Sequence, residues 1–344
     1  MSYRLPLPGD KIYAPFKIAA LVEILEAQGI SPANSLQGTG IKPDQVHNAY
    51  VRISVRQYAR VCVNALQLSA DPRTSFLVGS KLHLFAYGMY GYALMSCPSL
   101  RDYFVLGVKY HLLAAPTLKI RWEERSDTAV WLFPDEFTFA SSPELRRFLI
   151  EQQFMQHVTH LQDVAGRKAF PVQACFSYPA PDHASIYSEH LGCPCYFDQP
   201  ICELHYSNQI LGYKPVLSHD LSANLLRDTC DDLVCKAVTS TGLGEEVYQL
   251  LIRAPGRFMN MEDVANKFHM TSRTLRRRLA EEGLSFSEIL DDARRTLSIE
   301  HLRSTHLRID DICSLVGFSD VSNFRKAFKR WTGDSPRNLR RHAS

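Results

Sequence analysis

Two groups of cationic side chains in the last hundred residues are the strongest candidates for chemistry in this sequence. They consist of Arg273, Arg276 and Arg277, and of Arg325, Lys326 and Lys329. Guanidinium groups pair with phosphate and with the O6 and N7 atoms of guanine, and an ammonium group binds phosphate as a point charge. The residues after Gly244 carry 18 Lys and Arg against 14 Asp and Glu, whereas those up to Gly244 carry 21 against 22. This small excess fits either a surface that binds a polyanion or an ordinary solvated surface. Which of the two applies depends on the elements that present these side chains.

A pair of short helices is predicted to present the first group. Asn260-Met-Glu-Asp263 can cap one helix, Met270-Thr-Ser272 makes the turn into the next, and Gly283 ends that helix. The apolar residues that would face a shared core are Val264, Ala265, Phe268, Leu275 and Leu279. Because Leu275 and Leu279 are one turn apart and face inward, the arginines lie on the opposite and flanking sides. This pattern is a helix-turn-helix unit.

The same pattern occurs a second time. Ser285-Phe-Ser-Glu288 is a capping box that opens a longer helix to about Arg303, and Ile309–Gly317 begins the second unit. The buried stripe of its last helix consists of Phe324, Ala327, Phe328 and Trp331. The intervening helix of about 19 residues spans roughly 28 Å at 1.5 Å per residue, near the ~34 Å between successive major grooves on one face of DNA. Two recognition helices can therefore read one duplex together.

Here the chain resembles the AraC/XylS family of transcription regulators, over about residues 245–341. The resemblance is carried by Met270-Thr-Ser-Arg-Thr-Leu-Arg-Arg-Arg-Leu279, Gly283-Leu-Ser-Phe286, Val316-Gly-Phe-Ser319 and Phe324-Arg-Lys-Ala-Phe-Lys-Arg-Trp-Thr-Gly333, followed by Ser335-Pro336. It implies a sequence-specific DNA-binding regulator, expected to be an activator, whose all-α DNA-binding domain has two helix-turn-helix units joined by a long helix. The implied partners are double-stranded promoter DNA and RNA polymerase.

The family's DNA-reading positions fall on particular residues of this sequence. In the first unit they are Arg273, Arg276 and Arg277, with Ser272 and Thr274 as backbone contacts. In the second unit they are Val321, Ser322, Arg325 and Lys326, with Lys329 as a phosphate contact. Val321 departs from a polar recognition surface, because at an outward position it would touch a thymine methyl group or nothing.

The residues before this domain predict a mixed α and β fold. Helix signals occur at Ala14–Gly29, at the capping box Ser54 and Gln57, at Ser99 with Asp102, at Ser142–Gly166, and near His183–His190. Alternating residues predict a hairpin over Leu118–Phe133 around Ser126-Asp127, and short strands at Val172–Tyr178 and Ile201–Tyr206. Small residues at Thr239–Gly244 suit a linker. The expected domains are 1–232 and 245–344, with a linker over 233–244.

This first part also resembles the effector-sensing, arabinose-binding-like domain that a subset of the family places before its DNA-binding half. The resemblance is carried by Gly88–Leu100, Phe176–Pro181, Leu191–Phe197 and Ile201–Tyr206. It implies an α+β sensor domain with a small antiparallel sheet, which binds a small-molecule effector and can form a homodimer. The candidate effector contacts are Phe85, Tyr87, Tyr90 and Tyr92, although an aromatic run with interleaved glycines more often serves packing.

A metal or thiol site is the competing interpretation of the first domain. The possible ligands that fall within sixteen residues are His190, Cys193, Cys195, Cys202 and His205. Their spacing argues against zinc, because Cys202 and His205 lie on a predicted strand that sends them to opposite faces. His157 and His160 share a helix face but lack a nearby third ligand. We therefore expect no metal and no cofactor, and keep a metal- or thiol-responsive regulator that senses through Cys193, Cys195 and Cys202 as the alternative function.

The sequence contains no motif that predicts an enzyme. Alkyl-transfer DNA-repair proteins can carry a DNA-binding half of this type, but the four-cysteine arrangement that they need is missing. The Gly-x-Ser-x-Gly, phosphate-loop and His-Glu-x-x-His patterns are absent as well. Nine cysteines with no leader segment, and no apolar run of roughly 18 to 20 residues, predict free thiols in a cytoplasmic protein that does not enter the membrane.

Overall fold

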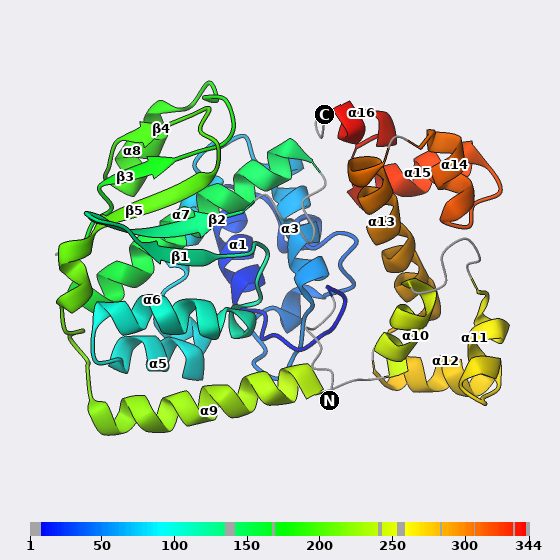
Figure 1. The fold of residues 1–344 in the computed structure, drawn as a ribbon, viewed down its shortest axis with the longest axis horizontal. Helices are drawn as coiled ribbons and strands as arrows, with labels where there is room; N and C mark the ends of the chain where they lie inside the picture. Colours follow the sequence, from blue (N-terminus) through cyan, green and yellow to red (C-terminus); the bar gives the residue numbers. More distant parts are fainter. Residues whose placement is uncertain are drawn as a thin grey trace. The chain divides into compact units, whose positions relative to one another are not determined.

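The computed structural model describes residues 8–134, 142–166, 169–239, 243–252, 259–282, 284–305, 307–332 and 334–341. They form two compact units (Figure 1). The first unit contains the described residues of 11–139 and 143–237, and the second contains those from 238 onward together with 8–10 and 142. Gly283 and Gly333 of the motif stretches, and residues 240–242 of the predicted linker, lie outside the described residues.

The helices of the first unit begin where the sequence provides capping side chains. In the predicted capping box, Ser54 Oγ accepts a hydrogen bond from the Gln57 N–H at 3.2 Å, and Gln57 Oε1 accepts one from the Ser54 N–H at 2.9 Å. Ser99 caps a later helix in the same way, and Gly29 follows the first long helix with φ of +82°. The helices and 3₁₀ turns are α1 Phe16–Ala27, α2 Pro32–Ser35, η1 Pro43–Gln45, α3 Val55–Leu68, α4 Thr74–Lys81, η2 Leu84–Tyr87, α5 Met89–Ser96, α6 Leu100–Lys109, η3 His111–Ala114, α7 Pro143–Ala165, α8 Ser185–Leu191, η5 Asn208–Gly212 and α9 Asp220–Thr239.

The sheet of the first unit contains, among the described residues, β1 Arg121–Glu124, β2 Thr128–Phe133, β3 Gln173–Cys175, β4 Cys195–Tyr196 and β5 Cys202–Ser207. Its strand order is β1-β2-β5-β3-β4, and the predicted hairpin is the β1–β2 pair. The pairs β1–β2, β2–β5 and β3–β5 are antiparallel, whereas β3 and β4 are parallel. The sheet is therefore mixed rather than antiparallel throughout, because α8 crosses over between β3 and β4 and returns the chain in the same direction.

The core of the first unit is built around α7, of whose 23 residues 16 are buried. On the side of the sheet, Phe133 of β2 lies 4.8 Å from Phe154 between ring centroids. On the side of α4, a Cβ atom added at Gly79 would lie 2.5 Å from the carbonyl oxygen of Gln152. The close approach of α4 to α7 therefore requires glycine at this position.

His157 and His160 of α7 are core residues. The ring of His157 stacks on Trp131 at 4.5 Å between centroids, and His160 Nε2 is hydrogen-bonded to the Leu82 carbonyl at 2.8 Å. Burial lowers the pKa of His160 to about 3 and the pKa of His157 well below its usual value. Both rings are therefore neutral at physiological pH and contribute packing.

Helix α9 covers part of the predicted linker. Residues 233–239 continue the helix, because Leu-Val-Cys-Lys-Ala at 233–237 contains no glycine or proline that would end it. Contacts with α6 and the residue after it hold α9: Lys109 Nζ lies 2.7 Å from Asp231 Oδ1, and Tyr110 Oη donates to the Arg227 carbonyl at 3.1 Å. No helix among the described residues meets the length and apolarity required to cross a membrane.

The second unit is all-helical in its described residues. Its helices are α10 Leu243–Ile252, α11 Met261–Lys267, α12 Ser272–Glu281, α13 Phe286–Ser304, α14 Ile309–Leu315, α15 Val321–Thr332 and α16 Pro336–Arg341. It contains two hydrophobic cores, and α13 contributes to both. Phe286, Ile289 and Ala293 from its first half belong to one core, and Leu297 and Leu302 from its second half belong to the other. The long predicted helix is thus the shared scaffold of the unit.

Candidate nucleic-acid interface

Helices α11 and α12 form the first predicted helix-turn-helix unit. Asn260 Oδ1 caps α11 by accepting hydrogen bonds from the N–H groups of the second and third helix residues, both at 2.9 Å. The chain turns at His269, whose φ is +53°, and Thr271 caps α12 by accepting from the Thr274 N–H at 3.2 Å. Two capped helices joined by a short turn are the geometry that the sequence predicts.

The two sides of α12 differ sharply in burial. Leu275 and Leu279 are fully buried in the first core. The predicted DNA contacts Arg273, Arg276 and Arg277 are exposed, and Ser272 and Thr274 are half-buried at the helix start. Arg278, which the sequence interpretation omits, is exposed as well. The apolar spacing therefore correctly placed the arginines outside the core.

Helices α14 and α15 form the second unit. Gly317 in the turn has φ of +76°, and Asp320 Oδ1 caps α15 by accepting from the Asn323 N–H at 2.7 Å, a cap that the sequence interpretation did not identify. Phe324 and Phe328 are fully buried. The predicted contacts on the exposed side of α15 are Ser322, Arg325, Lys326 and Lys329. With Arg330, α15 carries four cationic residues and no acidic residue, so its exposed side suits a polyanion.

Val321 does not lie at the outward position that the sequence predicts. It is half-buried and packs against the second core. The first residue of α15 is close enough to the turn for an aliphatic side chain to reach that core. Its packing accounts for an apolar residue among polar neighbours.

Arg294 of α13 is a positioning residue that sequence reasoning missed. Its Nη2 donates a hydrogen bond to the carbonyl oxygen of Gly317 at 2.9 Å, and its guanidinium carbon lies 4.6 Å from the centre of the Phe318 ring. Both contacts connect α13 to the turn between α14 and α15. Two adjacent arginines, 294 and 295, within an amphipathic helix were the only indication in the sequence. They do not predict which distant turn Arg294 contacts.

The four aromatic residues predicted as effector contacts divide into a buried pair and an exposed pair. Tyr87 and Tyr90 are 7% and 5% exposed, whereas Phe85 and Tyr92 are 64% and 46% exposed. Tyr87 packs on Phe16 with 4.6 Å between ring centroids, and Tyr90 Oη donates to a backbone carbonyl of α6 at 3.2 Å. The buried pair contributes packing, and the other two lie at the surface.

The possible metal ligands that lie together around β5 are not the three cysteines of the alternative prediction, Cys193, Cys195 and Cys202. Ligand atoms of Cys175, Glu203 and His205 lie within 4.8 Å of one another. Cys175 was missed because only the pairing of β3 with β5 brings it there. Glu203 is ion-paired with Arg125 at 2.7 Å and lies 2.8 Å from His205. Cys202 Sγ instead accepts a hydrogen bond from the Ser177 N–H at 3.3 Å. All nine cysteines are free thiols, as predicted.

The fold and its paired helix-turn-helix units define a DNA-binding transcription regulator. Residues 29–214 match the arabinose-binding domain of AraC transcription regulator, N-term, and residues 264–342 match a helix-turn-helix domain. This chain belongs to the AraC family, in the group whose N-terminal domain is of the arabinose-binding type.

Known proteins resemble the chain over nearly its full length. The ornithine utilization regulator of Pseudomonas aeruginosa is 29% identical and covers 93% of this chain and 94% of its own length. An uncharacterized HTH-type transcriptional regulator of Mycobacterium tuberculosis is 27% identical and covers 96% of this chain and 97% of its own. The crystal structure of the transcriptional regulator CdpR from Pseudomonas aeruginosa, 22% identical, covers 95% and 98% with a TM-score of 0.49.

Proposed function

We propose that the chain binds promoter DNA through α12 and α15 and activates transcription when a small-molecule effector occupies its N-terminal domain. The observation that supports DNA binding best is that two helix-turn-helix cores share α13, and that the second helix of each unit has cationic residues on its exposed side. Neutralising phosphates supplies affinity, and contacts with base edges supply sequence preference.

The proposed roles follow from residue type and exposure. Arg273, Arg276 and Arg277 of α12 and Ser322, Arg325 and Lys326 of α15 contact base edges. Ser272, Thr274 and Lys329 contact the DNA backbone, and Val321 contributes at most a methyl contact beside its packing role. The half-buried state of Ser272 and Thr274 supports backbone contact, because their short side chains let α12 approach the phosphates closely.

Effector control is supported by the class of the N-terminal domain. The relative named for ornithine utilization makes amino acids the first class of effector to test. The effector would act by binding more tightly to the state of the protein that binds promoter DNA well than to the state that binds it poorly. RNA polymerase is the partner through which an activator of this class works, and we place the protein in the cytoplasm.

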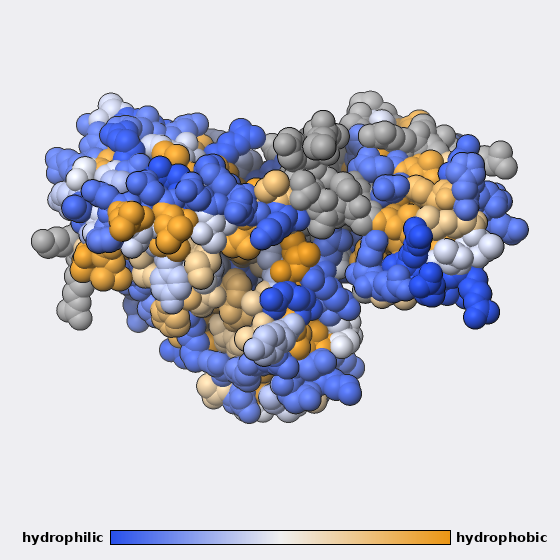
Figure 2. Space-filling model, turned by 90° about the horizontal axis from the view of Figure 1, so that it is seen from below, coloured by the Kyte–Doolittle hydropathy of each residue, from blue (hydrophilic) through white to orange (hydrophobic). Residues whose placement is uncertain are grey.

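A homodimer is proposed from the surface of the N-terminal unit. Val216, Leu217, Leu221 and Leu225 are 74%, 61%, 76% and 67% exposed. Figure 2, viewed from the side on which α9 lies in Figure 1, shows apolar surface gathered on this face of the unit. Contiguous exposed apolar residues on a globular protein mark an interaction surface. Sedimentation of the full chain should show a dimer that Leu221→Glu converts to a monomer, and a monomeric wild type at all concentrations would refute the dimer.

A metal- or thiol-responsive regulator is the second candidate. It is favoured by the proximity of Cys175, Glu203 and His205, with Cys195 on the neighbouring strand β4 and Cys193 two residues before it. Promoter binding by the full chain would then change on addition of Zn²⁺ or of a mild thiol oxidant, and Cys175→Ser would abolish the change. A response that survives this substitution argues against the site.

The test of the main proposal is a mobility-shift assay with the full chain on DNA upstream of its own and neighbouring genes. Random DNA of equal length is the control. We expect a saturable complex that resists competition by random DNA and protects two adjacent major grooves about one helical turn apart. Equal affinity for both kinds of DNA would refute a sequence-specific regulator.

A further inference from the structure

A pocket of about 110 Å³ in the first unit has a buried carboxylate in its wall. It lies between the end of α3, the loop of residues 69–72, the start of α4 and the first half of α7. Its polar lining consists of Ser69, Asp71, Thr74, Ser75, Glu144, Arg147, Glu151 and His183. Because one water molecule needs about 10–15 Å³ of space for its centre, the pocket holds roughly seven to eleven water-sized groups. It therefore suits a ligand of about the size of an amino acid.

Glu151 provides the buried carboxylate, and its side chain is 5% exposed. Two neutral hydroxyl groups donate to it: Ser75 Oγ at 2.5 Å to Oε2, and Tyr187 Oη to Oε1. A carboxylate has about four lone-pair directions, so these two donors leave room for more. The nearest basic nitrogens among the described residues are Arg147 Nε at 3.7 Å and His183 Nε2 at 3.8 Å, both beyond direct hydrogen-bond distance. A cationic donor in the pocket would offset the cost of burying this charge.

Arg147 offers the complementary charge on the same wall. It lies one turn before Glu151 on α7, and its side chain is 34% exposed. Among the residues that the structure describes, no acceptor takes a hydrogen bond from its guanidinium, whose planar edge can bind a carboxylate with two parallel bonds. The apolar part of the lining comes from Ala65, Leu66, Pro72 and Phe148. The pocket thus combines three carboxylates, of which Glu151 is the buried one, with a guanidinium group and an apolar wall.

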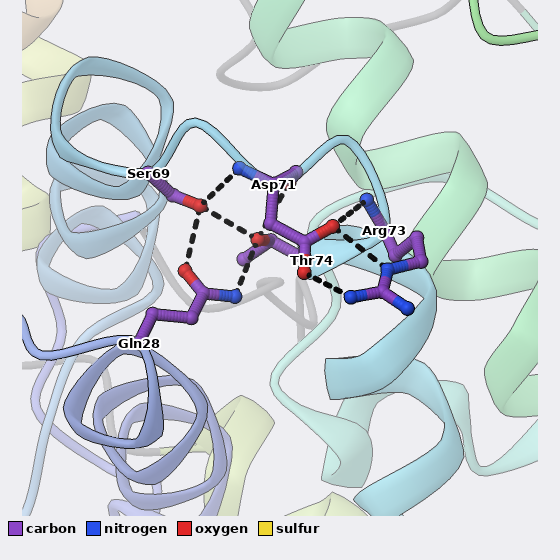
Figure 3. A network of polar contacts seen from close by, with 5 residues as sticks. All are labelled: Gln28, Ser69, Asp71, Arg73 and Thr74. Atoms are coloured by element: carbon purple, nitrogen blue, oxygen red, sulfur yellow. Dashed lines mark hydrogen bonds and ion pairs between the residues drawn. The ribbon is translucent and has the colours of Figure 1, made fainter.

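The rim of the pocket is held in place before any ligand arrives (Figure 3). Gln28 joins two rim residues, since its Nε2 donates to Thr74 Oγ1 at 3.0 Å and its Oε1 accepts from Ser69 Oγ at 2.6 Å. Asp71 is occupied by Arg73, whose Nε and Nη2 donate to its two oxygens at 2.9 and 2.8 Å. Asp71 therefore does not compete with Glu151 for a cation, and the preformed rim lowers the entropic cost of binding.

We propose that this pocket binds a zwitterion of amino-acid size, with its ammonium group on Glu151 and its carboxylate on Arg147. That the pocket binds such a ligand follows from its lining alone. That this ligand is the effector rests on the proposed function. This places the effector away from the aromatic run at 85–92.

The experiment is calorimetric titration of the full chain with three matched probes: ornithine, 1,4-diaminobutane, which lacks the carboxylate, and pentanoate, which lacks both amines. We expect ornithine to bind and the other two to bind at least tenfold more weakly. Glu151→Gln should weaken ornithine at least tenfold, while Glu23→Gln, at an exposed residue paired with Lys81 at 2.8 Å, should change nothing. Arg147→Met should weaken ornithine and should not weaken diaminobutane, since it removes a cation beside the carboxylate that binds the amine. Thermal unfolding verifies that each variant is folded. If Glu151→Gln destabilises the unit, Arg147→Met still tests the pocket, because Arg147 is only half-buried.

The outcomes separate this proposal from the proposed function. No binding of any probe at millimolar concentration, or unchanged ornithine affinity in folded Glu151→Gln and Arg147→Met, would overturn the pocket. Diaminobutane that binds as tightly as ornithine would overturn the zwitterion assignment. A wild-type chain that binds ornithine but has no preference for promoter DNA would refute the proposed function and leave the pocket standing.

Discussion

Arg277 and Glu281 form an ion pair along the exposed side of α12, with 2.6 Å between Arg277 Nη1 and Glu281 Oε1. Their side chains are 66% and 58% exposed. Residues four apart on a helix are neighbours, and such a pair contributes only about 0.3 to 0.5 kcal/mol in water. The carboxylate therefore orients the guanidinium, yet a phosphate or a guanine can displace it.

Arg277→Ala should reduce affinity for the operator by about 1 to 3 kcal/mol if Arg277 reads a base, with the loss concentrated at one operator position. Mobility-shift titrations on operators with single base-pair changes measure this. Glu281→Gln is the matched variant: it removes a competing carboxylate and should raise affinity for all sequences. Equal losses by Arg277→Ala on operator and random DNA would remove the base-reading role.

Lys329→Ala should weaken binding to operator and random DNA by similar factors, because a phosphate contact carries no sequence information. Removing one phosphate contact should also reduce the slope of log affinity against log salt concentration by about 0.9. Titrations between low and moderate salt give the slope. An unchanged slope, or a loss confined to the operator, would contradict this role.

Arg294→Met should loosen the turn of the second unit, since it removes a charged hydrogen bond to Gly317 and the cation–π contact with Phe318. We expect about 1 to 3 kcal/mol less protection against hydrogen exchange at backbone amides of 309–318. Arg330→Gln is the control, because its ion pair with Asp291 at 2.8 Å is exposed and contributes little. Equal protection in both variants would show that Arg294 does not hold the turn.

Gly79→Ala should destabilise the first unit by about 1 to 3 kcal/mol, because its Cβ would lie 2.5 Å from a backbone oxygen and 2.7 Å from Met155 Cβ on α7. Gly212→Ala is the matched control, with no atom within 4 Å of the added Cβ. Urea unfolding of the full chain measures the difference. A Gly79→Ala variant as stable as Gly212→Ala would mean that α4 and α7 can separate at little cost.

The first unit should lose stability as the pH falls below about 6.5. Burial lowers the pKa of His111 to about 4 and the pKa of His160 to about 3, so between these values and 6.5 the unfolded chain binds protons that the folded chain does not. The free energy of unfolding should therefore fall with falling pH, by at most about 1.4 kcal/mol per pH unit for each histidine. Urea unfolding at pH 7, 6 and 5 measures this, and His160→Gln should reduce the slope. A flat profile would contradict neutral buried histidines.

Features set by neighbouring residues could be predicted from the sequence. The capping box at Ser54 and Gln57, the inward Leu275 and Leu279, and the outward arginines of α12 all depend on spacing within one helix or at its end. Such local patterns report which face of an element is buried, and they located both helix-turn-helix units.

Features that depend on distant segments could not be predicted. Cys175 reaches His205 only through strand pairing, Arg294 contacts a turn more than twenty residues away, and the Glu151 pocket needs α3, α4 and α7 together. Periodicity carries no information on which elements become neighbours. Val321 was misplaced for a related reason, since its depth depends on the core beneath the helix start.

Helix α13 runs without interruption from Ala293 in one core to Leu297 in the other. The number of residues between them therefore sets the rotation of one helix-turn-helix unit relative to the other about the α13 axis. One inserted residue would rotate one unit against the other by about 100° and move it by about 1.5 Å along the axis. A rod of this kind cannot stretch or slide to follow a change in the spacing of its target. Any such mismatch would have to be absorbed by bending or twisting the bound polymer instead.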